Sequence, residues 1–326
     1  MVINKINKRL KRHLASLHQP QPESGFTLME LLMAILVGGM ITYGMLALVV
    51  SLLGTEKQET AKSQVQQEMN QALDYIASEI QQAVFIYNQD KFPPLAKLNL
   101  GDKVQPVIAF WKATPIKVQD LALPPDSNPC ANHPSPDCRL VLRNLQTYNL
   151  VIYGVRENKP DEIWQEGAAR IIRYEMKQYS DFATLTETPE YRSPPVAPSV
   201  IPVRPSSGDE FREWEPVANI NWGNAGKSSA VLVDGLDYQG VNAPQCPDPD
   251  YKLAMPPNPT TNPLNDSFYA CARSFSSEVS QDAILFLRGN AATRAGQPDS
   301  RNTGYLPSFE RRVQALTVLN RRPPSR

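Results

Sequence analysis

The residues with the clearest chemical purpose lie near the N-terminus, where an acid stands at the start of an apolar segment. No charged residue interrupts the run from Leu31 to Leu53, and Glu30 directly precedes it. As a helix, the stretch from Phe26 to Leu53 would measure about 42 Å at 1.5 Å per residue. That length exceeds the hydrocarbon thickness of a membrane, about 30 Å. Because a carboxylate is costly to bury in a membrane and usually has a partner, we expect Glu30 to have one.

The segment before the apolar run is basic. Residues 1–24 contain one acid, Glu23, and five basic residues, which are Lys5, Lys8, Arg9, Lys11 and Arg12. Positive charge before an apolar helix predicts a cytoplasmic N-terminus. A secretory signal has a shorter apolar core that a small-residue cleavage site follows, whereas here the small residue, Gly25, precedes a long run. A plain single-pass anchor is the alternative, but it leaves Glu30 unexplained.

The four cysteines are predicted to form disulfides, because a head beyond the membrane would lie in an oxidising compartment. Cys130 and Cys138 bracket seven residues, which favours a local bridge, and Cys246 would then pair with Cys271. Four cysteines allow three connectivities, and the alternative is that some stay free and buried. The absence of a C-x-x-C pair argues against structural zinc.

Composition excludes several classes of chemistry. Of the three histidines, His13 and His18 lie in the basic N-terminal stretch, and only His133 remains for a metal site or a Ser-His-Asp triad. The chain has no P-loop, G-x-G-x-x-G, H-E-x-x-H or G-x-S-x-G motif. Lys plus Arg equals Asp plus Glu, at 33 each, which disfavours nucleic-acid binding. We therefore expect no cofactor, no resident metal and no catalytic residue, and we expect His133 to be solvated.

Two alternatives would give the head some chemistry. An oxygen-rich region could hold calcium, although it lacks an EF-hand pattern and Asp beside Pro is common in turns; its members are Asp248, Asp250, Asn265 and Asp266. A membrane-anchored glycosidase would need two carboxylates, and no motif marks such a pair. We expect the protein not to be an enzyme.

The N-terminal pattern resembles the class III signal of type IV prepilins and type II secretion pseudopilins. In that family a basic leader is followed by Gly, an aromatic or apolar residue, Thr-Leu-x-Glu and an apolar helix, here Gly25, Phe26, Thr27-Leu28, Glu30 and residues 31–53. The resemblance implies that a prepilin peptidase cuts between Gly25 and Phe26 and N-methylates Phe26. It also implies that Glu30 pairs with the N-terminal amine of a neighbouring subunit. Cleavage would leave a mature chain with a net charge of −4.

An amphipathic stretch predicts that the N-terminal helix continues beyond the membrane. From residue 55 to about 87 there is no proline, and apolar residues recur every three or four positions, at Val65, Met69, Leu73, Ile76, Ile80, Val84 and Tyr87. Pro93 and Pro94 then end the helical region. The predicted organisation is a leader (1–25), a membrane and assembly helix (26–53), its amphipathic continuation (54–88) and a head (89–326).

The head is predicted to be β-rich. Strands are expected at 107–112, 140–142, 148–156, 170–179, 230–233, 283–287 and 313–319, with 148–156 and 170–179 forming a hairpin and with 230–233 and 283–287 buried. Proline-rich loops separate them, at 115–136, 189–205 and 244–263. The fold class is therefore α+β and pilin-like, with a long N-terminal helix packed on a β-rich head.

The size of the head indicates a minor subunit, similar to J-type pseudopilins and W-type minor pilins. Three runs, with the four cysteines, resemble the cyanobacterial hormogonium polysaccharide secretion pseudopilins of the C type. They are Pro106-Val-Ile-Ala-Phe-Trp-Lys112, Arg170-Ile-Ile-Arg-Tyr-Glu175 and Leu285-Phe-Leu-Arg-Gly-Asn290. The resemblance implies a role in polysaccharide secretion and gliding motility.

These resemblances imply partners and a location. The partners would be prepilin peptidase, other pilins or pseudopilins, an inner-membrane assembly platform, membrane lipid and the exported polysaccharide. The chain would cross the inner membrane once with its head in the periplasm, and after assembly it would lie in a pilus or pseudopilus or at the cell surface. A minor type IV pilin for pilus assembly, twitching or adhesion is the alternative within the class.

Overall fold

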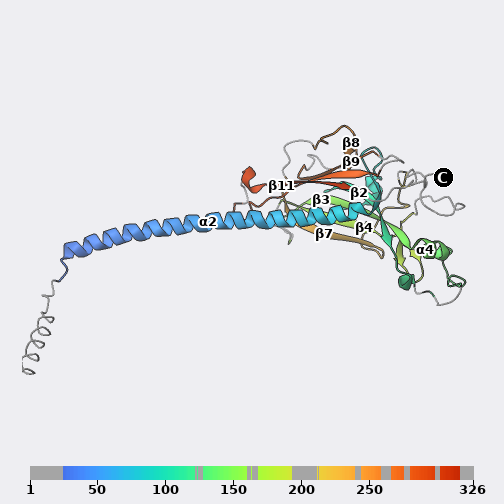
Figure 1. The fold of residues 1–326 in the computed structure, drawn as a ribbon, viewed down its shortest axis with the longest axis horizontal. Helices are drawn as coiled ribbons and strands as arrows, with labels where there is room; N and C mark the ends of the chain where they lie inside the picture. The colour runs from blue at the N-terminus through green and yellow to red at the C-terminus, as the bar shows by residue number, and fades with distance from the viewer. Residues whose placement is uncertain are drawn as a thin grey trace, which may run out of the picture. The chain divides into compact units, whose positions relative to one another are not determined.

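The computed structural model has an α+β fold, in which a long N-terminal helix precedes antiparallel sheets (Figure 1). It describes residues 25–121, 123, 128–159, 163, 168–192, 211, 213–238, 244–257, 266–274, 280–297 and 302–315. The leader before Gly25, most of the 189–205 loop and residues 316–319 of the last expected strand lie outside this set. The chain divides into two compact units, Met1–Glu56 and Lys57–Arg326.

Helix α2 (Leu28–Gln81) contains both the apolar and the amphipathic stretch, and it continues unbroken through Gly38, Gly39 and Gly44. It ends about six residues earlier than the sequence predicts. Strand β1 (Ala83–Ile86) is formed by residues that were expected to end the amphipathic helix. Residues 83–87 are apolar throughout and buried on every side, so they lack the polar face that a surface helix needs. Pro93 and Pro94 therefore follow a strand instead of ending the helix.

The larger sheet has five antiparallel strands in the order β1-β2-β3-β4-β7, namely β1, β2 (Val104–Pro115), β3 (Gln146–Glu157), β4 (Ala169–Met176) and β7 (Lys227–Leu236). The expected hairpin is confirmed, because β3 pairs with β4 from Leu150 opposite Met176 to Glu157 opposite Ala169. The 230–233 segment does lie in a strand, but the expectation that it is buried is wrong. Within outer strand β7, residue 230 is exposed and residues 231–233 are half-buried.

The smaller sheet has the order β11-β10-β9-β8, with β8 (Tyr251–Leu253), β9 (Phe268–Arg273), β10 (Asp282–Arg288) and β11 (Ser308–Gln314). Strand β10 confirms the buried strand expected at 283–287. Strand β11 lies mostly before the 313–319 segment that was expected. A single bridge between Leu236 and Gly289 joins β7 to the residue that follows β10.

Shorter elements complete the head. They are α3 (Leu95–Leu98), η1 (Val118–Leu121), α4 (Cys138–Asn144), β5 (Tyr179–Asp181), β6 (Thr186–Glu187) and η2 (Thr303–Tyr305), of which β5 and β6 pair. The strand expected at 140–142 is wrong, because these residues lie in α4. A run of three apolar residues is too short to separate a strand from a helical turn.

The main core lies where the second half of α2 meets both sheets. Val65, Met69, Leu73, Ile76 and Ile80 form one buried cluster with residues of the larger sheet, such as Ile108, Phe110, Val151, Tyr153 and Ile171, and of the smaller sheet, such as Ala270, Ala272, Ala283 and Leu285. The alanines of β9 and β10 keep the smaller sheet close to the helix, because short side chains permit a short distance between backbones.

A second core covers the opposite face of the larger sheet and is aromatic. The Trp111 indole lies 5.1 Å from that of Trp214, edge to face, and it donates to the Tyr87 hydroxyl at 2.8 Å. The Tyr87 hydroxyl in turn donates to the Phe211 carbonyl. Trp222 lies 4.9 Å from Tyr174 in the same cluster. Both faces of the larger sheet are therefore covered, α2 on one and the aromatic cluster on the other.

One glycine sets how closely the helix can approach. A Cβ at Gly289 would lie 2.6 Å from Cγ1 of Val65 and 3.0 Å from Cγ of Met69. We predict that Gly289→Ala lowers the free energy of unfolding by about 1–3 kcal/mol, the usual cost of overpacking a core. Gly223→Ala is the matched control, because its nearest neighbour would be 3.4 Å away. Denaturant unfolding of the full chain in detergent micelles measures both, and equal effects would contradict the packing argument.

Candidate functional site

The residues that the sequence marks as functional lie at the start of α2. The Thr27 carbonyl accepts from the N–H groups of Glu30 at 3.0 Å and Leu31 at 3.1 Å, and the Thr27 hydroxyl oxygen lies 3.3 Å from the Glu30 nitrogen. Thr27 is therefore the N-cap, and Glu30, three residues on, stands in the position of a capping box. An acid in the first turn also opposes the positive end of the helix dipole.

This local role of Thr27 was missed in the sequence, although the Thr-x-x-Glu spacing was its signal. Because of its position in the capping box, Glu30 stabilises the first turn of α2 independently of any partner that it binds. Gly25 and Phe26 precede the cap in a segment that is neither helix nor strand, and Phe26 is 80 % exposed. Neither has a hydrogen bond that would hinder access to the peptide bond between them in the described structure.

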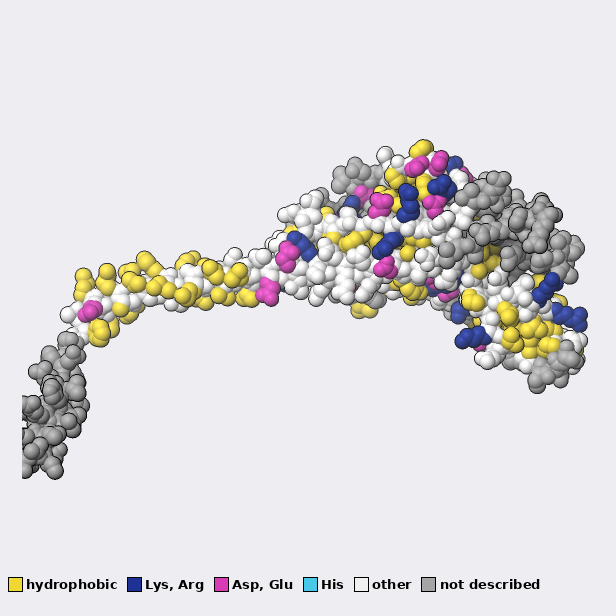
Figure 2. Space-filling model, viewed as in Figure 1, with side chains coloured by type: hydrophobic (Ala, Val, Ile, Leu, Met, Phe, Trp, Pro, Cys, Tyr) yellow, Lys and Arg dark blue, Asp and Glu magenta, His cyan; other side chains and the backbone are white. Residues whose placement is uncertain are grey.

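The first half of α2 presents apolar side chains on all sides. Every described side chain from residue 28 to 53 is exposed, and Figure 2 shows hydrophobic side chains gathered along this part of the helix. Among the described residues, α2 is the one helix long and apolar enough to cross a membrane. Two hydroxyls along this part of the helix bond to its own backbone, since the Thr42 hydroxyl donates to the Gly38 carbonyl at 2.8 Å and the Thr55 hydroxyl donates to the Ser51 carbonyl at 3.1 Å. Such a surface requires lipid or protein to cover it.

In the second unit, a buried cluster of charges fastens the last turns of α2 to the larger sheet. Glu79 is only 5 % exposed, and Arg173 donates to its two carboxylate oxygens at 2.8 and 2.7 Å. Lys112 and Tyr153 donate to the same carboxylate. Glu175 completes the cluster by accepting from Arg173 at 3.0 Å. One helix residue is thus bound by side chains from β2, β3 and β4.

The cluster changes the acidity of its members. Burial raises the pKa of the Glu79 carboxyl, but the hydrogen bonds from Arg173, Lys112 and Tyr153 outweigh it and lower that pKa to about 2. Glu175 shows the same balance, with burial opposed by Arg173 and Lys112, and its pKa is also lowered. A glycosidase needs one carboxyl with a raised pKa as proton donor, and this carboxylate pair does not provide it.

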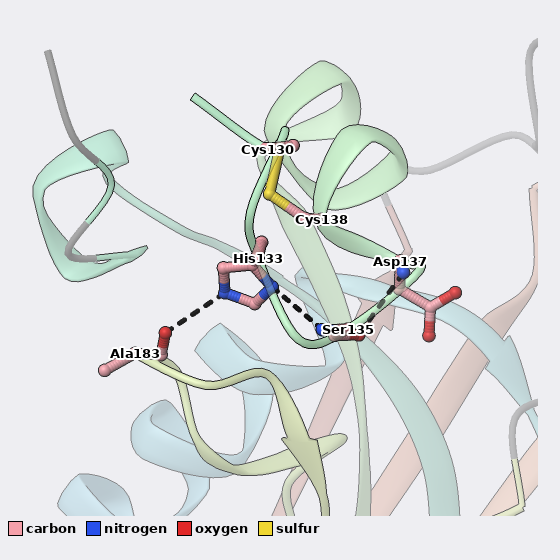
Figure 3. Close-up of a disulfide and its surroundings, with 6 residues drawn as sticks. All are labelled: Cys130, His133, Ser135, Asp137, Cys138 and Ala183. Carbon is pink, nitrogen blue, oxygen red and sulfur yellow. Dashed lines mark hydrogen bonds between the residues drawn. A yellow bond between two sulfur atoms is a disulfide. The ribbon is translucent and has the colours of Figure 1, made fainter. Parts of the chain in front are cut away.

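The two expected disulfides are both present, Cys130–Cys138 and Cys246–Cys271. The first closes a loop onto α4, as Figure 3 shows. In that loop the Ser135 N–H donates to Nδ1 of His133 at 3.1 Å, so Nε2 carries the proton and donates to the Ala183 carbonyl at 3.1 Å. His133 is half-exposed, which agrees with the expectation that it is solvated, and its ring also connects the disulfide loop to the turn between β5 and β6.

The oxygen-rich region does not bring its members together into a cation site within the described residues. Asp266 accepts from Arg288 at 2.6 Å, and Asp248 accepts from the Asp250 N–H at 2.9 Å in a local turn. Asn265 lies outside the described residues. Among the residues that are described, no group of three or more His, Cys, Asp or Glu side chains could hold a metal ion.

Comparisons with protein-family models, with curated proteins and with solved structures found no match to this chain.

We predict that Glu79→Gln lowers the free energy of unfolding by about 3 kcal/mol, the lower end for a broken buried ion pair, because Arg173 keeps Glu175. Glu59→Gln on the same helix is the control. Glu59 is an exposed partner of Lys62, so its loss should cost less than about 0.5 kcal/mol. Chemical denaturation of the full chain in detergent micelles at pH 7 gives both values.

The variants Glu79→Gln and Glu59→Gln also test the lowered pKa of Glu79. Since the folded pKa of Glu79 lies below its ordinary value of 4.5, its contribution is complete above pH 4.5 and is lost as the pH falls towards about 2. The stability difference between wild type and Glu79→Gln should therefore narrow over that range, while Glu59→Gln follows wild type. A difference that stays constant from pH 7 to pH 2 would exclude this role of Glu79.

The two disulfides should differ in their contribution to stability. Cys246–Cys271 closes a loop of 25 residues and ends on fully buried Cys271, so replacing both by serine should cost about 3 kcal/mol. Cys130–Cys138 closes only 8 residues, so its loss should cost about 2 kcal/mol and should speed amide exchange mainly around α4. Unfolding and hydrogen-exchange measurements on the two double variants give the order, and the reverse order would refute it.

Proposed function

We propose that this protein is a minor pseudopilin, a subunit of a type IV pilus or type II secretion-like machine. The observation that carries the proposal is the start of α2, where the exposed apolar half of the helix follows Gly25 and Phe26 and places Glu30 in its first turn. A plain membrane anchor needs neither the acid nor the glycine at those positions. In the pilin-like scheme, Gly25 and Phe26 form the cleavage site and Phe26 becomes the N-methylated first residue.

The way the second half of α2 is fixed in the head also supports the proposal of a pseudopilin. A subunit drawn into a filament by its N-terminal helix must transmit that pull to its head without the helix coming loose. Here the helix enters the core through Val65, Met69 and Ile76 and is fixed by Glu79. The α+β head would be pilin-like, and it would set contacts or specificity without performing chemistry.

The proposed roles of the remaining residues follow from membrane energetics. Glu30 would meet the amine of Phe26 of a neighbouring subunit, because a carboxylate and an amine each lower the cost of burying the other. The partners would be a prepilin peptidase, other pilins or pseudopilins, an inner-membrane platform and membrane lipid. We propose that the machine supports polysaccharide secretion and gliding motility, with the head in the periplasm or, after assembly, at the cell surface.

Intact-mass measurement and N-terminal sequencing of the protein from its native membrane test the class. We predict a chain that begins at Phe26 and is heavier by one methyl group, and that depends on a prepilin peptidase. Gly25→Val should leave the leader in place, because a branched side chain replaces the hydrogen at the cleaved bond, whereas the neighbouring change Ser24→Ala should be cut normally. An uncut wild-type chain starting at Met1 would refute the proposal and favour a membrane-anchored domain.

Deletion of the gene for this protein distinguishes a pseudopilin of a secretion machine from a minor type IV pilin. Loss of exported polysaccharide with pili still present would support the secretion role. Loss of pili, twitching or adhesion would instead assign the chain to the minor type IV pilins.

A further inference from the structure

Helix α4 lies in a small lobe of the head and carries two arginines on one face. The lobe comprises the described residues of 116–145 and 179–187, whose buried side chains form a cluster of their own. Arg139 and Arg143 are four residues apart, so they are neighbours on the helix surface. Both are exposed, and in the part of the chain that the structure describes neither guanidinium makes a hydrogen bond or an ion pair. Like charges at this spacing destabilise a helix unless an anion binds between them.

The two arginines line a hollow of about 190 Å³ between α4 and the loop before it. The other residues that line it in the described part of the chain are Asn128, Pro129, Cys130 and Leu142. None of these residues is acidic. The hollow therefore combines two positive charges with apolar surface from Pro129 and Leu142, and its described lining does not balance the charge.

The two walls of the hollow are fastened to each other. The disulfide joins Cys130 in the loop to Cys138 at the start of α4 (Figure 3). The ring of His133, in the same loop, accepts from the Ser135 N–H and bonds to the Ala183 carbonyl. Because the walls are fixed in advance, an occupant of the hollow would lose little affinity to the ordering of the site.

The charge of the whole lobe indicates what kind of anion the hollow fits. The described residues of the lobe carry three basic side chains against four acidic ones, namely Lys117, Arg139 and Arg143 against Asp120, Asp137, Asp181 and Glu187. A polyanion or a surface of anionic lipid would spread over the lobe and meet these acids as well. A single carboxylate would meet only the two arginines, so the local charge favours a small acidic group.

We propose that this hollow binds an aspartate or glutamate side chain of a neighbouring polypeptide chain, with an apolar residue beside it. A guanidinium presents paired donors that match the two oxygens of a carboxylate. A carboxylate between Arg139 and Arg143 would also remove the repulsion between them, while the apolar residue packs on Leu142 and Pro129. The site belongs to the head alone, so it would bind in this way whether or not the protein is a pseudopilin.

Photo-cross-linking in cells that produce the full chain natively tests this proposal. Benzoylphenylalanine replaces Asn128, an exposed residue of the lining, and the adducts are mapped by mass spectrometry. We expect adducts to one segment of a second polypeptide chain, and we expect that segment to contain an aspartate or glutamate beside an apolar residue. The same probe at Ser308, the exposed first residue of β11 in the smaller sheet, is the control and should give little adduct.

Charge reversal provides the second test. In the chain that carries the probe at Asn128, Arg143→Glu should reduce the adduct by about tenfold, because repulsion replaces a charge-assisted hydrogen bond. Lys117→Glu makes the same change of charge in the same lobe but outside the lining, and it should leave the adduct unchanged. Replacing the mapped acid of the partner by arginine should restore the adduct of the Arg143→Glu chain. If Arg143→Glu fails to fold, Arg143→Gln takes its place and should also weaken the adduct.

Several results would overturn the proposal. They are labelling no stronger than at Ser308, labelling only within the same chain, and labelling of lipid or sugar instead of a polypeptide. An equal loss of adduct with Lys117→Glu would show that the charge of the lobe, and not the hollow, attracts the partner. Failure of the charge exchange to restore the adduct would exclude a direct contact between the arginine and the mapped acid.

Discussion

The contact between Glu79 and the larger sheet is the constraint on which the rest of this head depends. A carboxylate in the last turns of a helix would normally face water, yet this one points into the sheet and is bound by groups from three strands. The arginine, lysine and tyrosine that hold it are spaced across β2, β3 and β4, so they fix both the rotation of α2 about its axis and its position along the strands. The apolar stripe alone, with a repeat of three or four residues, would tolerate a shift of one turn.

Because α2 is held in this register, the two sheets contribute different kinds of side chain to the core around it. The larger sheet supplies the charged partners and the bulky residues Phe110 and Tyr153. The smaller sheet supplies Phe268, Leu285 and Leu287 to the same core, and its alanines and Gly289 leave room for the helix. One helix can therefore serve as core for both sheets, which among the described residues are joined by backbone hydrogen bonds where β7 and β10 end. Among the described residues its first half has no such neighbours, and its apolar side chains are exposed.

Much of this could be predicted from the sequence where the signal is local and repetitive. The long apolar run, the stripe from Val65 to Ile80, the β3–β4 hairpin and the two disulfides are signals of that kind. The end of α2 could not be predicted, because Val84 and Tyr87 continue the helical spacing. Only the available sheet edge places Val84 in strand β1 and Tyr87 directly after it. The ion cluster around Glu79 could not be predicted either. In the sequence, Lys112, Arg173 and Glu175 fit the usual alternation of polar and apolar residues along a strand, and only the pairing of distant strands brings them to Glu79. The N-cap at Thr27 was visible but was assigned only to the cleavage signal.

The aromatic cluster has a practical consequence for anyone who follows this protein by spectroscopy. Trp111, Trp214 and Trp222 all belong to it, on the face of the larger sheet that is turned away from α2. Their emission therefore reports on the solvent access of that face and only indirectly on the helix. If the head released α2 but kept its aromatic face, the emission of these three tryptophans would change little. A dye placed on the helix, for example at exposed Asp74, would register the same event at once.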